Sequence, residues 1–216
     1  MSQDHVLIVY EIIAFVFAIC VHESAHAWTA NKCGDPTARM LGRISLNPIK
    51  HVDPIGTILV PAIGILSGFG FVGWAKPTPV NPLNLRHQVR DDILVSLAGP
   101  ASNFLIALVA ALGLEAISLA VGTRGIPSTS ILVPTVMLLR VFILINILLL
   151  AFNLIPVPPL DGSHVIRHML SDSAQRIYDG VGIFAFLLLF WVGGRVIQIF
   201  EMPFFLFFRT VFPGIF

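Results

Sequence analysis

Charged residues are scarce in this chain of 216 residues, because Asp, Glu, Lys and Arg together make up only 12% of the sequence. A soluble domain of this length carries roughly 25% charged residues. Apolar residues make up 56%, and the mean hydropathy is +0.88. Such a chain would expose far too much apolar surface in water. The composition therefore excludes an ordinary soluble domain and predicts a membrane protein.

Cysteine and net charge are also low. Only Cys20 and Cys33 occur, their spacing matches no zinc-knuckle pattern, and we expect both to be free thiols. The net charge of +1 gives no reason to expect a nucleic-acid partner. The N-terminus lacks the positive region and the cleavage site of a signal peptide, so we expect it to remain in the mature protein.

Long apolar runs are present instead. Four of them reach the roughly 20 residues that a membrane-spanning helix needs, namely 6–30, 93–121, 131–155 and 177–200. A fifth apolar segment, 55–74, is interrupted by Pro61 and by several glycines. The predicted fold class is an all-α polytopic membrane protein with four to six transmembrane helices. It has short extended loops and a re-entrant or broken segment near 55–74.

The first apolar run ends in three ionisable residues, His22, Glu23 and His26, within "FAICVHESAHAWTA". Side chains four residues apart lie on the same face of a helix, so the two histidines can bind one metal ion. Glu23 lies beside them and can act as general base for a catalytic water. Two buried histidines that bond across helices are the structural alternative. Ionisable residues inside a membrane span are costly and usually functional, which favours a zinc site.

A catalytic zinc usually has three protein ligands, and this motif supplies two. Asp161, in "NLIPVPPLDG", is the favoured third ligand. Three prolines must end the preceding helix there and leave an extended backbone that presents the carboxylate. An ordinary turn is the alternative, since Leu-Asp-Gly is good turn chemistry. Five other residues remain possible but lack a helpful setting: His51, Glu115, His164, His168 and Glu201.

The pair "HESAH" and "NLIPVPPLDG" resembles the site-2 protease family of intramembrane zinc metalloproteases, and matches every fixed position of both family motifs. The segments "GRISLNPIKHVDPIGT", "GWAKPTPVNP" and "SLAGPASNF" resemble further family segments, so the likeness covers about residues 15–165. The resemblance implies one zinc ion per chain, bound by His22, His26 and Asp161. It also implies that Glu23 is the catalytic base and that Asn153 lies near the substrate or the developing oxyanion.

The function implied by this resemblance is hydrolysis of peptide bonds in transmembrane segments of other proteins, as in regulated intramembrane proteolysis. We expect transmembrane protein substrates and the lipid bilayer as partners. The extended loops 42–54 and 74–82 are candidates to hold an unwound substrate by strand addition. A non-proteolytic zinc-binding membrane protein or transporter is the alternative, and it would not need Glu23 beside the histidines.

The resemblance also bears on domain organisation, because the PDZ and nucleotide-sensing domains frequent in the family are not found in the sequence. This predicts a minimal form, a single membrane-embedded metalloprotease domain over residues 1–216. Its catalytic core would occupy about 6–165, and a C-terminal helical segment would occupy 177–216.

A shared metal site constrains the membrane topology. His22 lies about 24 Å along the first span, near the far side of a core roughly 30 Å thick. Asp161 follows the 131–155 span, and it reaches a similar depth only if 55–74 is re-entrant. Most basic residues of the short connections then fall on the active-site side, and Arg124 falls on the other. The positive-inside rule makes the active-site side cytoplasmic, so we predict an integral protein of the cell membrane. The basic residues on this side are Lys32, Arg39, Arg43, Lys50, Lys76, Arg86, Arg90, Arg167 and Arg176.

Overall fold

The computed structural model describes residues 3–67, 73–122, 126–127 and 130–214, and these residues form helices and loops with no strand among them. The prediction of an all-α fold is confirmed. The helices in chain order are α1 (Gln3–Cys33), α2 (Thr37–Met40), η1 (Pro48–Lys50), η2 (Pro54–Leu59), α3 (Val60–Ser67), η3 (Pro82–Asn84), α4 (Gln88–Val121), α5 (Leu132–Asn153), α6 (Gly162–Arg167) and α7 (Asp172–Val211).

Three helices, α1, α4 and α5, are long and apolar enough to cross a membrane. Large apolar side chains of α4 stay exposed, with Leu105 at 59% and Val109 at 67% exposure, as expected for residues that face lipid. The chain is therefore an integral membrane protein. The predicted span 177–200 lies inside α7, which is not among the three candidates in the described part of the chain. The total of four to six spans stays a prediction.

Contacts divide the chain into two units, one of residues 16–99 and the other of residues 1–15 with 100–216. Two helices belong to both units, because the division falls between Phe15 and Val16 in α1 and between Gly99 and Pro100 in α4. The single domain expected over 1–216 stays a prediction.

Three short helices of the 16–99 unit begin in the same way, with an Asn or Asp followed by proline. In each case the side-chain oxygen of the first residue accepts a backbone N–H two residues further on. Proline fits the first helical position because the N–H that it lacks would have no helical partner there. The pairs are Asn47–Pro48, Asp53–Pro54 and Asn81–Pro82, which start η1, η2 and η3.

The two ends of the segment 55–74 are joined by hydrogen bonds. The backbone N–H of Trp74 donates to the carbonyl of Gly56 at 3.0 Å, and the Thr57 hydroxyl donates to the Trp74 carbonyl at 2.8 Å. A side chain at Gly56 would overlap the Trp74 indole, so this approach requires glycine. The two ends of the segment therefore meet, as the re-entrant prediction requires. Its residues 68–72 lie outside the described part of the chain.

A buried carboxylate, Asp35, ties the end of α1 to the start of η3. Its side chain accepts hydrogen bonds from the backbone N–H groups of Thr37 at 3.1 Å and Asn81 at 2.7 Å, and from the Asn84 amide at 2.9 Å. Burial opposes ionisation of Asp35, but these hydrogen bonds together outweigh it and hold its pKa below the ordinary value. The ionised form of Asp35 therefore stabilises the contact between the end of α1 and the start of η3.

We expect the contribution of Asp35 to stability to depend on pH. The folded-state pKa lies below the unfolded value of about 3.9, so the stabilisation is present above about pH 4 and is lost as the pH falls through the folded pKa. Asp35→Asn should lower the melting temperature by several degrees near neutral pH, and this deficit should shrink in acid. Melting curves of both proteins in detergent across this range test it. A difference in melting temperature that stays constant with pH would contradict the stabilising role of the ionised Asp35 carboxylate.

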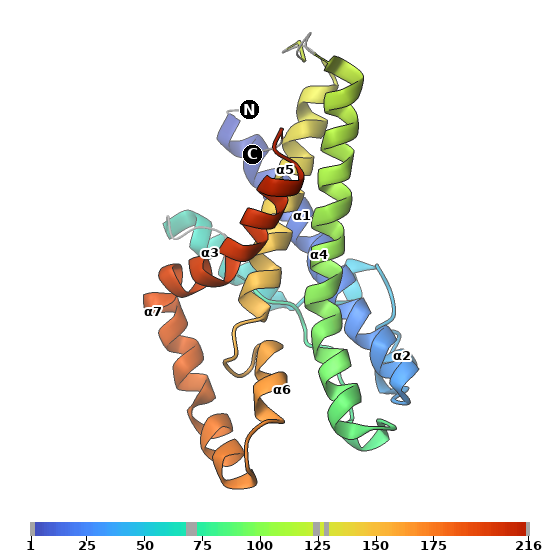
Figure 1. The fold of residues 1–216 in the computed structure, drawn as a ribbon, viewed down its shortest axis with the longest axis vertical. Helices are drawn as coiled ribbons and strands as arrows, with labels where there is room; N and C mark the ends of the chain where they lie inside the picture. The colour runs from blue at the N-terminus through green and yellow to red at the C-terminus, as the bar shows by residue number, and fades with distance from the viewer. Residues whose placement is uncertain (1–2, 68–72, 123–125, 128–129, 215–216) are drawn as a thin grey trace. The chain divides into compact units, whose positions relative to one another are not determined.

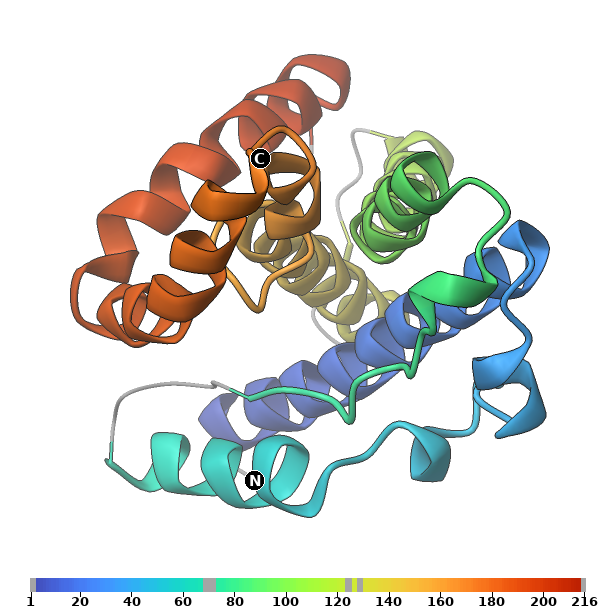
Figure 2. The same cartoon turned by 90° about the horizontal axis from the view of Figure 1, so that it is seen from below.

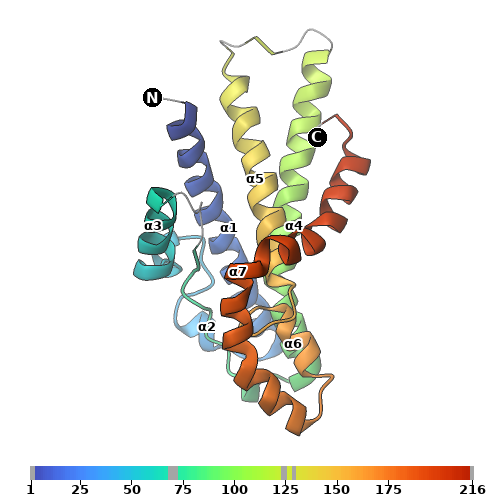
Figure 3. The same cartoon turned by 90° about the vertical axis from the view of Figure 1, so that its left-hand side faces the viewer.

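The main hydrophobic core of the other unit lies where α4, α5 and the end of α7 meet (Figures 1 and 3). Small residues of α4 let the helices approach closely. Asn103 of α4 also donates its amide N–H to the Asn146 side chain of α5 at 2.9 Å, and both side chains are fully buried. The buried apolar members are Ala107, Ala110, Ala111, Leu114, Ile143, Ile147, Phe208 and Phe212.

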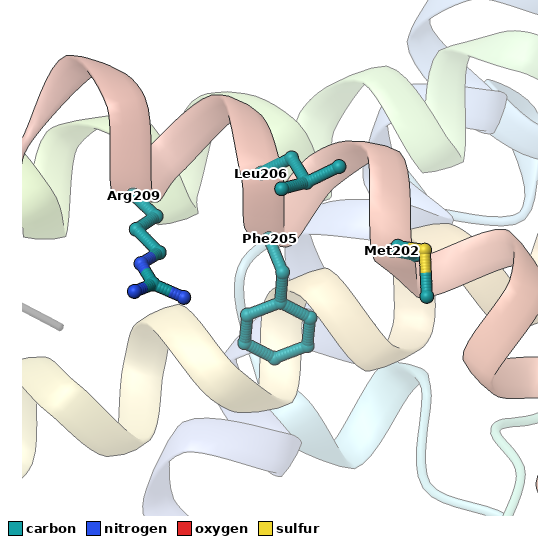
Figure 4. A pocket seen from close by; sticks show the side chains of 4 residues that line it. All are labelled: Met202, Phe205, Leu206 and Arg209. Atoms are coloured by element: carbon teal, nitrogen blue, oxygen red, sulfur yellow. The ribbon is translucent and has the colours of Figure 1, made fainter.

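A hollow of about 500 Å³ lies along the C-terminal part of α7. It is lined by Met202, Phe205, Leu206 and Arg209, and the Phe205 and Arg209 side chains point towards α5 (Figure 4). It brings together none of the residues that the sequence predicts for the metal site, so it is not a candidate for the catalytic centre.

Candidate metal centre

His22 and His26 lie one turn apart on the same face of α1. Their Nε2 atoms are 3.0 Å apart, and their ring centroids are 4.6 Å apart in an edge-to-face arrangement. Each residue is only 7% exposed. The predicted convergence of His22 and His26 is therefore confirmed, because their spacing of four residues directs two imidazole nitrogens at one point inside the protein.

A backbone carbonyl of α4 sets the orientation and the tautomer of the His26 imidazole. Its Nδ1 lies 2.7 Å from the backbone carbonyl of Val95 in α4, which can only accept, so Nδ1 carries the proton and Nε2 carries the lone pair. Tetrahedral zinc with Zn–N distances near 2.0–2.1 Å separates two nitrogens by roughly 3.3 Å. The separation from the His22 Nε2, 3.0 Å, is close to that value. The residues present fit a zinc ion.

Gly99 of α4 faces both imidazole rings. A methyl group at this position would overlap Nε2 of His26 and the Cε1–Nε2 edge of His22. Only glycine leaves room for the two rings to meet, which makes Gly99 part of the centre without being a ligand. The sequence singles out "SLAGPASNF" as a family-like segment, but neither spacing nor composition indicates this role.

Glu23 is held by an extended segment, residues 73–81, that runs alongside α1 (Figure 2). The backbone N–H of Thr78 donates to Oε2 of Glu23 at 2.8 Å, and the Thr78 hydroxyl donates to the Glu23 backbone carbonyl at 3.0 Å. The guanidinium of Arg43 lies 3.9 Å from the same Oε2. One carboxylate oxygen is therefore fixed, and Oε1 is the oxygen left to act on a water.

Thr78→Pro tests whether this backbone hydrogen bond positions the base. Proline removes the N–H, and its two proline neighbours already hold the segment extended. Losing a hydrogen bond to a charged group, worth about 1.5–3 kcal/mol, should lower kcat by roughly tenfold or more while KM and bound zinc change little. Thr78→Val, which keeps the N–H and loses only the hydroxyl, should stay near normal. Equal kcat values for the two variants would contradict this role of the N–H.

Arg43 and His51 are buried beside the base. Arg43 is 5% exposed, its Nη2 donates to the Lys76 carbonyl, and burial lowers its pKa against the opposing effect of Glu23. His51 is fully buried, and burial likewise lowers its pKa. Its Nε2 donates to the Ser45 carbonyl at 2.7 Å. This bond gives His51 a structural role in the loop before the re-entrant segment.

Asp161 belongs to the other unit, where it directly precedes α6. The prolines end α5 as predicted, but the backbone up to Asp161 forms turns closed by local hydrogen bonds instead of the expected extended segment. The Tyr178 hydroxyl of α7 donates to the Pro156 carbonyl at 2.9 Å. A side chain at Gly162 would overlap the carbonyl of Leu154, so the turn also requires glycine. Within the described part of the chain, Asp161 makes no capping hydrogen bond to α6, unlike an ordinary turn aspartate. Its role as third ligand stays a prediction.

Asn153 is the last residue of α5, and its amide donates one N–H to the Leu149 carbonyl at 2.9 Å. An amide has two N–H donors, so one remains for a substrate oxygen. The predicted role of Asn153 near the oxyanion stays a prediction. His164 lies in α6 and His168 directly follows it, and they remain alternatives to Asp161.

Comparison with known proteins gives consistent matches. The chain matches the model of peptidase family M50 over residues 10–123 and 119–190. It is 37% identical over 195 residues to the Bacillus subtilis protein named "Putative zinc metalloprotease YwhC", covering 85% of this chain and 81% of that protein. It is 30% identical over 180 residues to Rip2 of Mycolicibacterium smegmatis, which has the same designation, covering 82% and 63%. The Escherichia coli "Regulator of sigma-E protease RseP" is 31% identical over 105 residues, covering 46% and 23%.

No solved structure matches the chain. The family match nevertheless includes both segments that carry the predicted site, the histidine pair with Glu23 and the turn with Asp161. Together with the imidazole geometry, this shows that the chain belongs to peptidase family M50, the site-2 protease family of zinc metalloproteases.

Proposed function

We propose that this chain is a zinc-dependent endopeptidase that hydrolyses peptide bonds within transmembrane segments of other proteins. The observation that carries the proposal is the pairing of two converging imidazoles with a carboxylate whose second oxygen is already held. A helical peptide bond is shielded by its own hydrogen bonds, so the substrate must unwind locally before it is cut. Residues that break helices should make a substrate better.

We propose that one zinc ion per chain is held by His22, His26 and Asp161. When bound, zinc lowers the pKa of a coordinated water towards roughly 7 and polarises the peptide carbonyl. The buried imidazoles are fixed in direction by the Val95 carbonyl and by packing against Gly99. Fixed ligands of this kind keep a metal site in one geometry.

Glu23 does the proton transfer in this mechanism. Its Oε1 takes a proton from the attacking water, while Oε2 stays bonded to the Thr78 N–H. Oε1 then gives this proton to the leaving amine, which completes cleavage without a second acid. An N–H of Asn153 is proposed to stabilise the negative charge on the carbonyl oxygen.

The crossing count supports a shared site near one membrane face. We assign one crossing each to α1, α4 and α5, which are long and apolar enough to span a membrane, and none to the re-entrant segment. The C-terminal ends of α1 and α5 are then on the same side, which the basic residues mark as cytoplasmic. Arg124, expected on the opposite side, lies outside the described residues. Labelling of single cysteines at positions 2 and 85 should place them on opposite sides, and finding both on one side would refute the topology.

A zinc-binding protein or transporter without proteolytic activity is the less favoured alternative. It does not explain why Glu23 lies beside the histidines with one oxygen held by Thr78. Membership of a peptidase family also favours hydrolysis.

Cleavage of a single-span model substrate tests the proposed function. Purified protein in proteoliposomes should cut it, and mass spectrometry should place the cut inside the membrane-spanning segment. A zinc chelator should stop cleavage, and added zinc should restore it. Cuts confined to the loops outside the membrane would show a protease of a different kind. Cleavage unaffected by metal removal would refute the zinc mechanism.

A further inference from the structure

A groove of about 470 Å³ lies in the 16–99 unit between the loop before the re-entrant segment and the extended segment after it. Its charged lining residues are Arg43, Lys50 and Lys76, and no acidic residue lines it. We call this feature the lysine groove. Its apolar lining consists of Leu41, Ile49, Pro77 and Pro79.

The lysine groove adjoins the catalytic base. Arg43 forms part of its wall, and the same guanidinium lies 3.9 Å from Oε2 of Glu23 and donates to the Lys76 carbonyl. A polypeptide with its scissile carbonyl beside Glu23 would therefore have a neighbouring residue at the groove. The groove is placed to contact the substrate close to the bond that is cut.

The extended segment has few backbone N–H groups to offer a substrate. Successive residues of an extended chain point their N–H and C=O groups to alternate sides. On one side, Trp74, Lys76 and Thr78 donate to Gly56, His51 and Glu23. On the other side, Pro77 and Pro79 have no N–H to donate. The predicted strand addition to 74–82 stays a prediction, and a preference for charged substrate residues at this edge would have to come from side chains.

The side chains available for recognition are two lysines. Lys50 and Lys76 are exposed, and neither forms an ion pair with a residue in the described part of the chain. Arg43 already faces Glu23. The surrounding Leu41 and Ile49 are also exposed and offer contact to an apolar neighbour of the charged group.

We propose that the lysine groove binds an acidic side chain of the substrate, a few residues from the scissile bond, and that Lys50 and Lys76 select for it. This inference rests on the proposed proteolytic function. A phospholipid headgroup has similar charge, but the groove's position beside Glu23 favours the polypeptide. The groove would then make cleavage depend on sequence as well as on helix stability.

Charge reversal on both partners tests this selection. Single-span substrates carry Glu, Gln or Lys at successive positions beside the mapped cut, and kcat/KM is compared for wild type and Lys76→Glu. Wild type should prefer Glu over Gln by about 1.5-fold to fivefold at one position, as expected for exposed ion pairs. Lys76→Glu should instead prefer Lys at that position. Arg39→Glu, an exposed residue with the same charge change that does not line the groove, should keep the wild-type preference.

Each other outcome overturns the inference. A wild type that cuts all substrates equally, or a preference that survives both Lys76→Glu and Lys50→Glu, removes the role of the lysines. The lysine variants could also lose kcat/KM equally for all substrates, by an amount that depends on the anionic lipid content of the vesicles. That result would assign the groove to lipid binding. Binding of the same peptides to Glu23→Gln protein gives a readout that needs no cleavage. If the Glu23→Gln protein bound peptides with Glu no more tightly than peptides with Gln or Lys, the inference would be refuted. Failure of cleavage alone would refute only the proposed function.

Discussion

Replacing Glu23 by glutamine should abolish cleavage while leaving zinc bound. The amide keeps the size of the side chain and still offers an oxygen to the Thr78 N–H, but it cannot take a proton from water. Loss of a general base should lower kcat by about 100- to 10,000-fold. The two imidazoles are untouched, so metal analysis should find as much zinc as in wild type.

This pair of readouts separates catalysis from metal binding. His22→Ala removes a ligand and serves as the matched comparison, because it should lose both zinc and activity. If Glu23→Gln cut a helical substrate at the normal rate, Glu23 would not be the base. If it lost zinc together with activity, Glu23 would be needed for the metal site itself.

Gly99→Ala should weaken zinc binding and cleavage together. The added carbon would overlap the rings of both His22 and His26, so the imidazoles must turn away from each other. Changes that misorient metal-ligating histidines typically reduce metal affinity or activity by roughly 10- to 100-fold. We therefore expect weaker zinc binding and a matching loss of cleavage, measured by competition with a zinc indicator and by substrate turnover.

Helix propensity makes this prediction sharper. Alanine is favoured over glycine inside a helix by about 1 kcal/mol, so a loss at Gly99 has to come from the collision with the rings. Gly180→Ala is the matched control, since that position is also helical and nothing lies near the added carbon. The control should bind zinc and cut substrate normally. Normal zinc affinity in Gly99→Ala would contradict the tight fit around the histidines.

The sequence predicts the parts of the site that depend on local spacing. His22 and His26 converge because four residues make about one helical turn, and this needs no knowledge of the rest of the fold. The re-entrant course of 55–74 was also predictable, because a shared metal site requires the crossing count to be right. The contact between Trp74 and Gly56 agrees with it.

The supporting residues could not be predicted, because their partners are distant in sequence. Thr78 is 55 residues from Glu23, and nothing in the segment "GWAKPTPVNP" indicates that its backbone would bind this carboxylate. Gly99 matters only because α4 packs against α1 at that point, and glycines occur in apolar helices for several packing reasons that the sequence does not distinguish. The C-terminal helix shows the same limit, since α7 continues through Pro203 to Val211 where the apolar pattern alone leaves its path open.

Zinc content per chain, measured on purified wild type, Glu23→Gln and Asp161→Ala, tests the central claim most directly. The predicted result is one zinc in wild type and in Glu23→Gln, and little or none in Asp161→Ala, which should also lose cleavage. An Asp161→Ala protein that keeps its zinc and cuts substrate at the wild-type rate would contradict the claim that His22, His26 and Asp161 form the metal site.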